Sequence, residues 1–109
     1  MSRAKGNAAE ARAAAFLKAD GFTIIEQNYY AKKLGEIDII ACKDNVLHFV
    51  EVKSGEGFEA VYNLTPTKLS RVIKSAELYL KHKGLDSAYC IDAVIVSADE
   101  IEHLENITL

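Results

Sequence analysis

The sequence predicts a small α/β fold in which a mixed β-sheet is flanked by helices, in the order α-β-β-β-α-β. Two segments carry apolar side chains at helical spacing, and several short segments between them are rich in β-branched and aromatic residues. Of the 109 residues, 50% are hydrophobic and 27% are charged, a composition typical of an ordinary globular protein. With one proline and six glycines there is no linker-like stretch, so we expect a single domain over residues 1–109.

The first predicted helix covers residues 7–20. Ala13 and Leu17 fall on the same face at a period of 3.6 residues, and Gly21 follows as a stop signal. Residues 22–30 (FTIIEQNYY) are typical of a strand, because aromatic and β-branched side chains dominate them.

The next two strands are predicted to form a hairpin. The segments GEIDIIAC and VLHFVEVK are both strand-like, and Asp44 and Asn45 between them are residues that favour tight turns. A two-residue turn places Lys43 opposite Val46. The same register places Asp38 opposite Glu51, and Glu36 opposite Lys53.

The second predicted helix begins at Pro66, with Thr65 as its N-cap, and ends at a Gly84 C-cap. Its apolar stripe is formed by Leu69, Val72, Ile73, Ala76 and Leu80. Residues 88–97 form a nearly continuous apolar run, as expected of a strand covered on both faces. A weaker extended segment, IEHLENITL, ends the chain.

The charge is distributed unevenly around a formal net value of −3. Residues 1–33 and 67–83 have a basic excess, whereas residues 34–66 and 84–109 have an acidic one. A polyanion could contact the two basic segments despite the overall sign, but two solvated helix faces explain the pattern equally well.

No stretch approaches the roughly 18 consecutive apolar residues that a membrane span requires. The Ala-rich start is interrupted by charged side chains and lacks a signal-peptide core. We therefore expect a cytoplasmic protein without a membrane partner. Cys42 and Cys90 are predicted to be reduced core residues. His48, His82 and His103 are scattered along the sequence and predict no structural zinc site.

The hairpin carries the candidate chemistry. Because strand side chains alternate between faces, the predicted register brings Asp38, Glu51 and Lys53 to one face of the sheet. Two opposed carboxylates repel each other unless a cation offsets their charge, and Mg²⁺ prefers such oxygen ligands. A nearby lysine could orient a water molecule and stabilise a phosphate under attack. The alternative is a solvated sheet end with an ordinary ion pair between Glu36 and Lys53.

Gly35-Glu36-Ile37-Asp38 followed by Phe49-Val50-Glu51-Val52-Lys53 resembles the PD-(D/E)XK nuclease superfamily. More closely, the sequence is similar to the bacterial YraN-type family of predicted endonucleases, which is related to archaeal Holliday-junction resolvases. Further matches to the family pattern are Gly6, Glu10, Asn28, Tyr29, Lys68 and Asp92. The resemblance implies a restriction-endonuclease-like core and a Mg²⁺- or Mn²⁺-dependent endonuclease that hydrolyses phosphodiester bonds in branched or structured DNA.

The same resemblance implies roles for individual residues. Asp38 and Glu51 would be catalytic metal ligands, Lys53 the catalytic lysine, and Glu10 a further acidic metal ligand from the first helix. Glu10 also lies three residues after Asn7, which is the spacing of a capping box. Both interpretations of Glu10 stay open at this point, whereas a structural hydrogen bond is the expected role of Asp92.

Basic residues of the second helix are the candidate DNA contacts. Lys68, Arg71 and Lys74 follow one flank of the helix and could contact a phosphate backbone, or form a solvated face. The alternative function is a nucleic-acid-binding or assembly module on a nuclease-like fold that does not cut. A homodimer would place two sites side by side and suit cleavage of two strands. Phe58 and Tyr62 are expected in a loop at the rim of the site.

Overall fold

The computed structural model describes residues 2–55 and 64–108, with side chains from residue 8 onward, so the predicted rim residues Phe58 and Tyr62 lie outside the described part. The described elements confirm the predicted α/β order, and the weaker extended segment predicted at the end contains a short fifth strand. They are α1 (Ser2–Ala19), β1 (Thr23–Tyr30), the 3₁₀ turn η1 (Lys32–Leu34), β2 (Glu36–Lys43), β3 (Val46–Ser54), α3 (Pro66–Lys83), β4 (Tyr89–Val96) and β5 (Ile101–Leu104).

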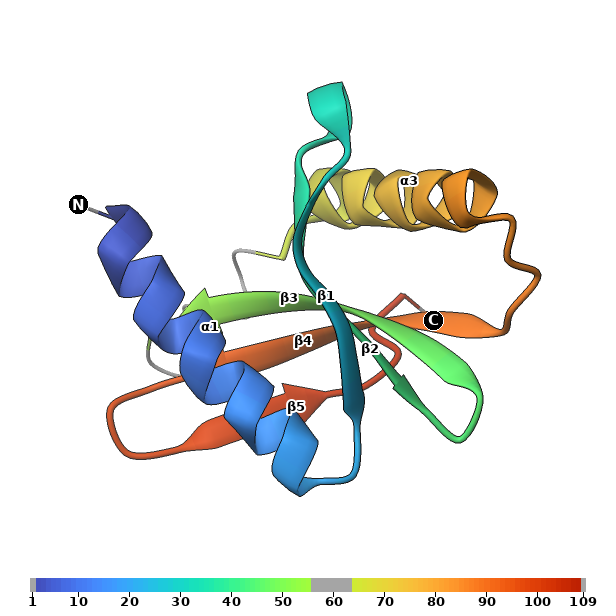
Figure 1. Cartoon of the computed structure of the whole chain (residues 1–109). Coiled ribbons are helices and arrows are strands. Elements are labelled where there is room, and N and C mark those ends of the chain that lie inside the picture. Colours follow the sequence, from blue (N-terminus) through green and yellow to red (C-terminus); the bar gives the residue numbers. More distant parts are fainter. Residues whose placement is uncertain (1, 56–63, 109) are drawn as a thin grey trace.

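The five strands form one mixed sheet in the order β1-β2-β3-β4-β5 (Figure 1). The pairs β1–β2, β2–β3 and β4–β5 are antiparallel, whereas β3 and β4 are parallel. Parallel neighbours cannot be joined by a tight turn. The chain therefore leaves the end of β3, passes through α3, and returns to the start of β4.

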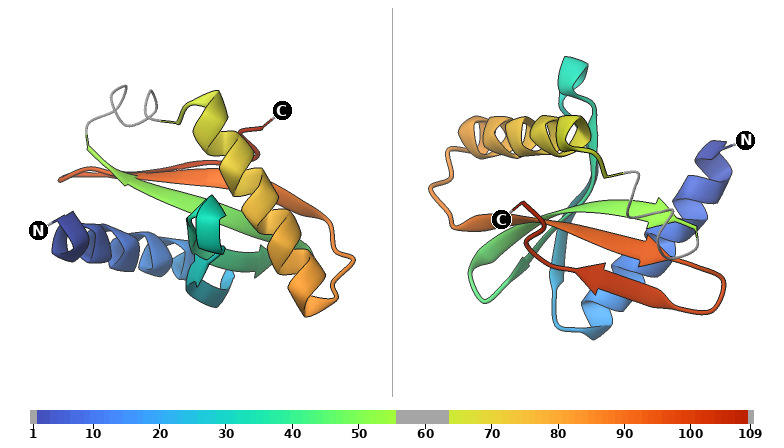
Figure 2. Two further views of the ribbon diagram at one scale, coloured as in Figure 1. Left: turned by 90° about the horizontal axis from the view of Figure 1, so that it is seen from above. Right: turned by 180° about the vertical axis from the view of Figure 1, so that it is seen from behind.

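The two helices cover opposite faces of the sheet (Figure 2). Ala13 and Leu17 of α1 pack on one face in a cluster with Val50. On the other face, Val72 and Tyr79 of α3 belong to the second cluster, whose strand residues are Ile37, Ile40, Leu47, Phe49 and Ile91. None of the described helices combines the length and the apolar character that a membrane crossing requires.

Helix α1 begins at Ser2, five residues earlier than predicted. Alanine has the highest helix propensity, so the Ala-rich start continues the helix through Gly6. Asn7 and Glu10 consequently both lie inside α1. The capping-box interpretation of Glu10 is therefore wrong, because a residue in the helix interior is no N-cap.

Helix α3 has the predicted bounds because both ends carry local signals. The Thr65 hydroxyl accepts a hydrogen bond from the Lys68 backbone N–H at 3.3 Å. Gly84 adopts the left-handed conformation at φ 63°, and its N–H donates to the Leu80 carbonyl. Tyr79 is 3% exposed and joins the core, although it is not part of the predicted apolar stripe.

The hairpin has the predicted two-residue turn, and its register matches the prediction next to that turn. The backbone ladder ends before the predicted pairs of Asp38 with Glu51 and of Glu36 with Lys53, so those two pairs do not form as ladder pairs. Asp44 and Asn45 both have positive φ angles, 53° and 66°, as a type I′ turn requires. Backbone pairing runs from Lys43 opposite Val46 to Ile39 opposite Val50. The Lys43 ammonium donates to the Asp20 carbonyl at 2.7 Å and so links the hairpin to the end of α1.

Candidate metal and phosphate site

The candidate site begins where the β2–β3 backbone ladder ends. Beyond the pair formed by Ile39 and Val50, the Asp38 carboxylate takes the place of a backbone acceptor. Its Oδ2 accepts a hydrogen bond from the Val52 N–H at 2.8 Å. This bond fixes the Asp38 side chain against β3, next to Glu51.

Asp38 and Glu51 form a half-buried carboxyl pair joined by a side-chain hydrogen bond. Burial, together with the negative charge of Asp38, raises the pKa of Glu51 to about 8. Burial also raises the pKa of Asp38, although the Val52 N–H opposes this shift. Since neither carboxyl ionises readily beside the other, the pair retains a proton that an isolated carboxyl group would lose.

One carboxylate oxygen of Glu51 has no hydrogen-bond partner among the described residues. This oxygen, Oε2, is buried. A buried oxygen of this kind is unfavourable unless a donor or a cation satisfies it. The charge of Lys53 favours ionisation of both carboxyls, but it leaves Oε2 without a direct donor.

A pocket of about 170 Å³ lies between Glu51 and α3. Its basic side chains are Lys53 from β3 and Lys68 and Arg71 from α3. Its acidic ones are Glu36 and Glu51. The remaining lining residues are Leu34, Gly35, Leu64, Leu69, Val72 and Ser75. Two of the three predicted DNA contacts thus share a pocket with Glu51, whereas Lys74 is exposed elsewhere on α3.

Glu36 and Lys53 both line this pocket, but they do not neutralise each other. In the described part of the chain, no ion pair joins them. The interpretation of this sheet end as an ordinary cross-strand ion pair therefore finds no support. The positive charge of Lys53 instead acts on Asp38 and Glu51, where it lowers the pKa of both carboxyl groups and so partly opposes the effect of burial.

Glu10 lies on α1 and reaches the sheet through Asn28 of β1. The Asn28 side-chain N–H donates to Glu10 Oε1 at 2.8 Å. The neighbours of Asn28 pair with Ile37 and Ile39, which flank Asp38, so this contact lies on the strand next to the carboxyl pair. Asn28 has a positive φ of 55°, a conformation that asparagine tolerates better than most residues.

These residues fit a hard divalent cation. Mg²⁺ and similar ions prefer oxygen ligands, need only one or two carboxylates, and complete their shell with water and phosphate oxygens. Asp38 and Glu51 supply two carboxylates, and the orphan Oε2 supplies an oxygen that lacks any other partner. Lys53, Lys68 and Arg71 supply the positive charge that a phosphate group requires.

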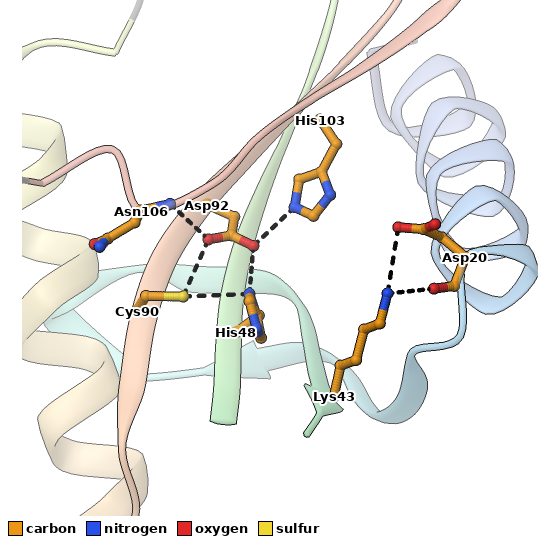
Figure 3. A network of polar contacts seen from close by, with 7 residues as sticks. All are labelled: Asp20, Lys43, His48, Cys90, Asp92, His103 and Asn106. Carbon is orange, nitrogen blue, oxygen red and sulfur yellow. Dashed lines mark hydrogen bonds and ion pairs between the residues drawn. The ribbon is translucent and has the colours of Figure 1, made fainter. Parts of the chain in front are cut away.

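A second polar cluster lies on the opposite face of the sheet, next to Phe22, which follows α1 (Figure 3). Asp92 is fully buried and its Oδ2 lies 2.6 Å from His48 Nδ1 and 2.8 Å from His103 Nε2. Its Oδ1 accepts from the Asn106 N–H at 3.0 Å and from the Cys90 thiol at 3.3 Å. The expected structural hydrogen bond of Asp92 is thus confirmed.

Although the histidines are scattered along the sequence, the fold brings His48 and His103 together. The ligand atoms of His48, Asp92, His103 and Glu105 all lie within 4.8 Å of one another, which makes them a possible metal-binding group. Sequence spacing did not indicate this group, because the β3–β4 and β4–β5 pairings bring its members together. The available signal was an aspartate in an otherwise apolar strand, two residues after a cysteine.

Comparison with known proteins agrees with the sequence motifs. The profile of the uncharacterised protein family UPF0102 matches residues 9–96. A UPF0102 protein of Wolinella succinogenes is 59% identical over 109 residues, covering all of both chains. One from Sulfurovum is 55% identical over 105 residues, which is 95% of this chain and 93% of the relative. One from Helicobacter hepaticus is 53% identical over 108 residues, which is 99% and 97% of the two chains.

The family profile covers the carboxyl pair, Lys53 and the basic residues of α3, and the relatives align along nearly the whole chain. On this evidence the chain belongs to the UPF0102 family, which is the YraN-type family that its motifs resemble.

Proposed function

We propose that the protein is a metal-dependent endonuclease that hydrolyses phosphodiester bonds of DNA, with branched or structured DNA as its preferred substrate. The observation that carries the proposal is the buried, unpartnered Oε2 of Glu51, beside Asp38 and in a pocket that also contains Lys53. A structural ion pair would satisfy this oxygen within the protein. A site that binds a cation leaves it available.

Asp38 and Glu51 would hold Mg²⁺ or Mn²⁺, which supplies Lewis-acid activation of a phosphodiester and of a water molecule. Lys53 would orient the water and stabilise the negative charge that develops on the phosphate. The water loses a proton to solvent as its oxygen bonds to phosphorus, the ester P–O bond breaks, and the leaving oxygen takes up a proton from solvent. The products would be a phosphate end and a hydroxyl end. Lys68 and Arg71 would bind the phosphates next to the scissile one.

The test is divalent-dependent cleavage of labelled duplex, single-stranded and four-way-junction DNA. We expect wild-type protein to cleave at least one substrate in Mg²⁺ or Mn²⁺. Asp38→Asn, Glu51→Gln and Lys53→Met should each lower the rate by at least about 100-fold, the scale of losing an electrostatic or acid–base contribution. The matched controls are Asp86→Asn and Lys81→Met, which change exposed residues outside the pocket.

Equal inactivity of wild type and variants on every substrate would overturn the catalytic proposal. The second candidate function is DNA binding without cleavage, which the position of Lys68 and Arg71 in the pocket favours independently. It predicts binding that Lys68→Ala weakens and Asp38→Asn leaves intact. An inactive protein with this binding pattern would therefore support the second candidate.

A further inference from the structure

We propose that His48, Asp92, His103 and Glu105 form a binding site for Zn²⁺ or a similar transition metal, on the face of the sheet opposite the Asp38–Glu51 pair. These residues offer two imidazole nitrogens and two carboxylates, with ligand atoms that all lie within 4.8 Å of one another. Imidazole nitrogen is a ligand that Zn²⁺ accepts and Mg²⁺ rarely uses.

The ligands come from three neighbouring strands and the segment that follows them. His48 lies on β3, Asp92 on β4 and His103 on β5, while Glu105 directly follows β5. His48 and Asp92 are buried, His103 is partly buried and Glu105 is exposed, so the group opens to solvent on the Glu105 side. A bound ion would clamp the edge strand β5 to the centre of the sheet.

Asp92 is already oriented as a metal ligand. The Asn106 N–H and the Cys90 thiol hold its Oδ1, so Oδ2 faces the two imidazoles (Figure 3). Outer contacts of this kind fix the direction of a metal-binding carboxylate. The Phe22 ring meets the His48 and His103 rings edge-on, at centroid distances of 4.9 and 5.6 Å, and forms an apolar wall.

The distances are compatible with a small adjustment. Zn²⁺ bonds of roughly 2.0–2.2 Å in a tetrahedron separate neighbouring ligand atoms by about 3.3 Å. The two imidazole nitrogens lie 2.6 and 2.8 Å from Asp92 Oδ2, so they would move outward by about half an ångström. Each neutral imidazole would carry its proton on the other ring nitrogen, which leaves a lone pair for the metal.

Charge also favours a cation. Asp92 and Glu105 bring two carboxylates to the group, and residues 84–109 contain no lysine or arginine. In the described part of the chain, the side chains that can carry positive charge beside Asp92 are the two histidines, and no lysine or arginine forms an ion pair with it. A divalent ion would neutralise both carboxylates without protonation of either imidazole.

The site is tested by calorimetric titration of metal-free, full-length protein with Zn²⁺, and by the visible absorption of bound Co²⁺. We expect one equivalent to bind to wild type in the presence of excess Mg²⁺. His103→Gln should lower the affinity at least about tenfold. His82→Gln, which changes an exposed histidine outside the group, should bind like wild type.

Glu51→Gln separates this site from the Asp38–Glu51 pair and should leave Zn²⁺ binding unchanged. Glu105→Gln provides a second ligand variant that preserves folding, because Glu105 is exposed, and it should also lower the affinity. Zn²⁺ should raise the Tm of wild type, and it should raise the Tm of Glu105→Gln less. The proposal is overturned if wild type binds no Zn²⁺ or Co²⁺, or if both ligand variants bind as tightly as wild type.

Discussion

Glu51 places one carboxylate oxygen in a buried position without a hydrogen-bond donor, beside the carboxyl group of Asp38. Burial and this neighbour raise its pKa to about 8 from an ordinary value of 4.5. Between these two pH values the folded protein binds a proton that the unfolded chain has released. The free energy of unfolding of metal-free protein should therefore fall as the pH rises from about 4.5 to about 8.

Glu51→Gln should remove this dependence, because glutamine does not titrate. The stability of the variant relative to wild type should increase steadily over the same pH range and level off above it. Urea unfolding in the presence of EDTA at a series of pH values measures the difference. Glu77→Gln, an exposed change on α3, is the control. A constant difference between Glu51→Gln and wild type from pH 4.5 to 8 would contradict the shift.

Asp92 presents a different situation, because donors surround its buried carboxylate. Burial opposes its ionisation, but hydrogen bonds from His103, the Asn106 backbone and His48 outweigh it and lower the pKa of Asp92. Asp92→Asn would turn an N–H group toward one of these donors. We expect a loss of about 3 kcal/mol in the free energy of unfolding, measured by urea denaturation without metal.

Asp86→Asn is the matched control for Asp92→Asn, because Asp86 is exposed in the loop after α3. It should change stability by less than about 0.5 kcal/mol. If Asp92→Asn changed the free energy of unfolding as little as Asp86→Asn, the hydrogen bonds of Asp92 would not contribute to stability.

The residues of the candidate site differ in how far sequence could predict them. The two-residue turn was enough to bring Asp38 close to Glu51, since turn length is a local property, although the backbone ladder ends before these two residues. Spacing along α3 could not show that Lys68 and Arg71, but not Lys74, line the pocket. That outcome depends on how α3 packs on the sheet.

At the scale of elements, the ends of α3 illustrate what local signals determine. Gly84 has φ 63° and ψ 36°, and a Cβ at this position would meet no atom within 4 Å. Gly84→Ala should therefore reduce the free energy of unfolding by about 1 kcal/mol, from the left-handed backbone alone. Gly84→Asn should cost less, because asparagine tolerates this conformation.

Thermal or urea unfolding of wild type, Gly84→Ala and Gly84→Asn tests this order. A larger loss for the asparagine variant would indicate a steric contact rather than a backbone preference. The comparison isolates the cap, because the Cβ that both substitutions add meets no atom within 4 Å.

Elements with clear end signals were predicted accurately, and those without them were not. Thr65, Pro66 and Gly84 gave the bounds of α3, whereas the Ala-rich start of α1 has no cap residue that marks Ser2. The 3₁₀ turn at Lys32–Leu34 was missed because it is only three residues long and has no side-chain cap at its start. The grouping of His48 with His103 was missed because strand order is a long-range property.

In the molecule as a whole, part of the uneven charge distribution is concentrated in the pocket beside Glu51. The net charge is −3, yet the pocket places Lys53, Lys68 and Arg71 together beside the carboxyl pair. If this pocket binds DNA, each phosphate contact contributes to the salt dependence of the affinity. Lys68→Ala should weaken binding to all sequences alike and reduce the slope of log K against log salt by about 1.

Lys81→Ala is the control for this prediction, because Lys81 lies at the far end of α3 and is exposed. Binding measured by fluorescence anisotropy over a range of salt concentrations gives the slope for each variant. Identical slopes for wild type, Lys68→Ala and Lys81→Ala would show that DNA does not enter this pocket.

The parallel pairing of β3 and β4 has a consequence for the order of assembly. The β2–β3 hairpin closes through contacts between residues close in the chain, which form rapidly. The segment that joins β3 to β4 is long and contains α3. Pairing of β4 with β3 therefore has a larger loop-closure entropy cost than closure of the β2–β3 hairpin, and it should come later. A chain still emerging from the ribosome would thus bring Asp38 and Glu51 together first. Lys68 and Arg71 would take their places beside them only after α3 has been synthesised and packed on the sheet. Affinity for phosphate would therefore indicate that the fold is complete.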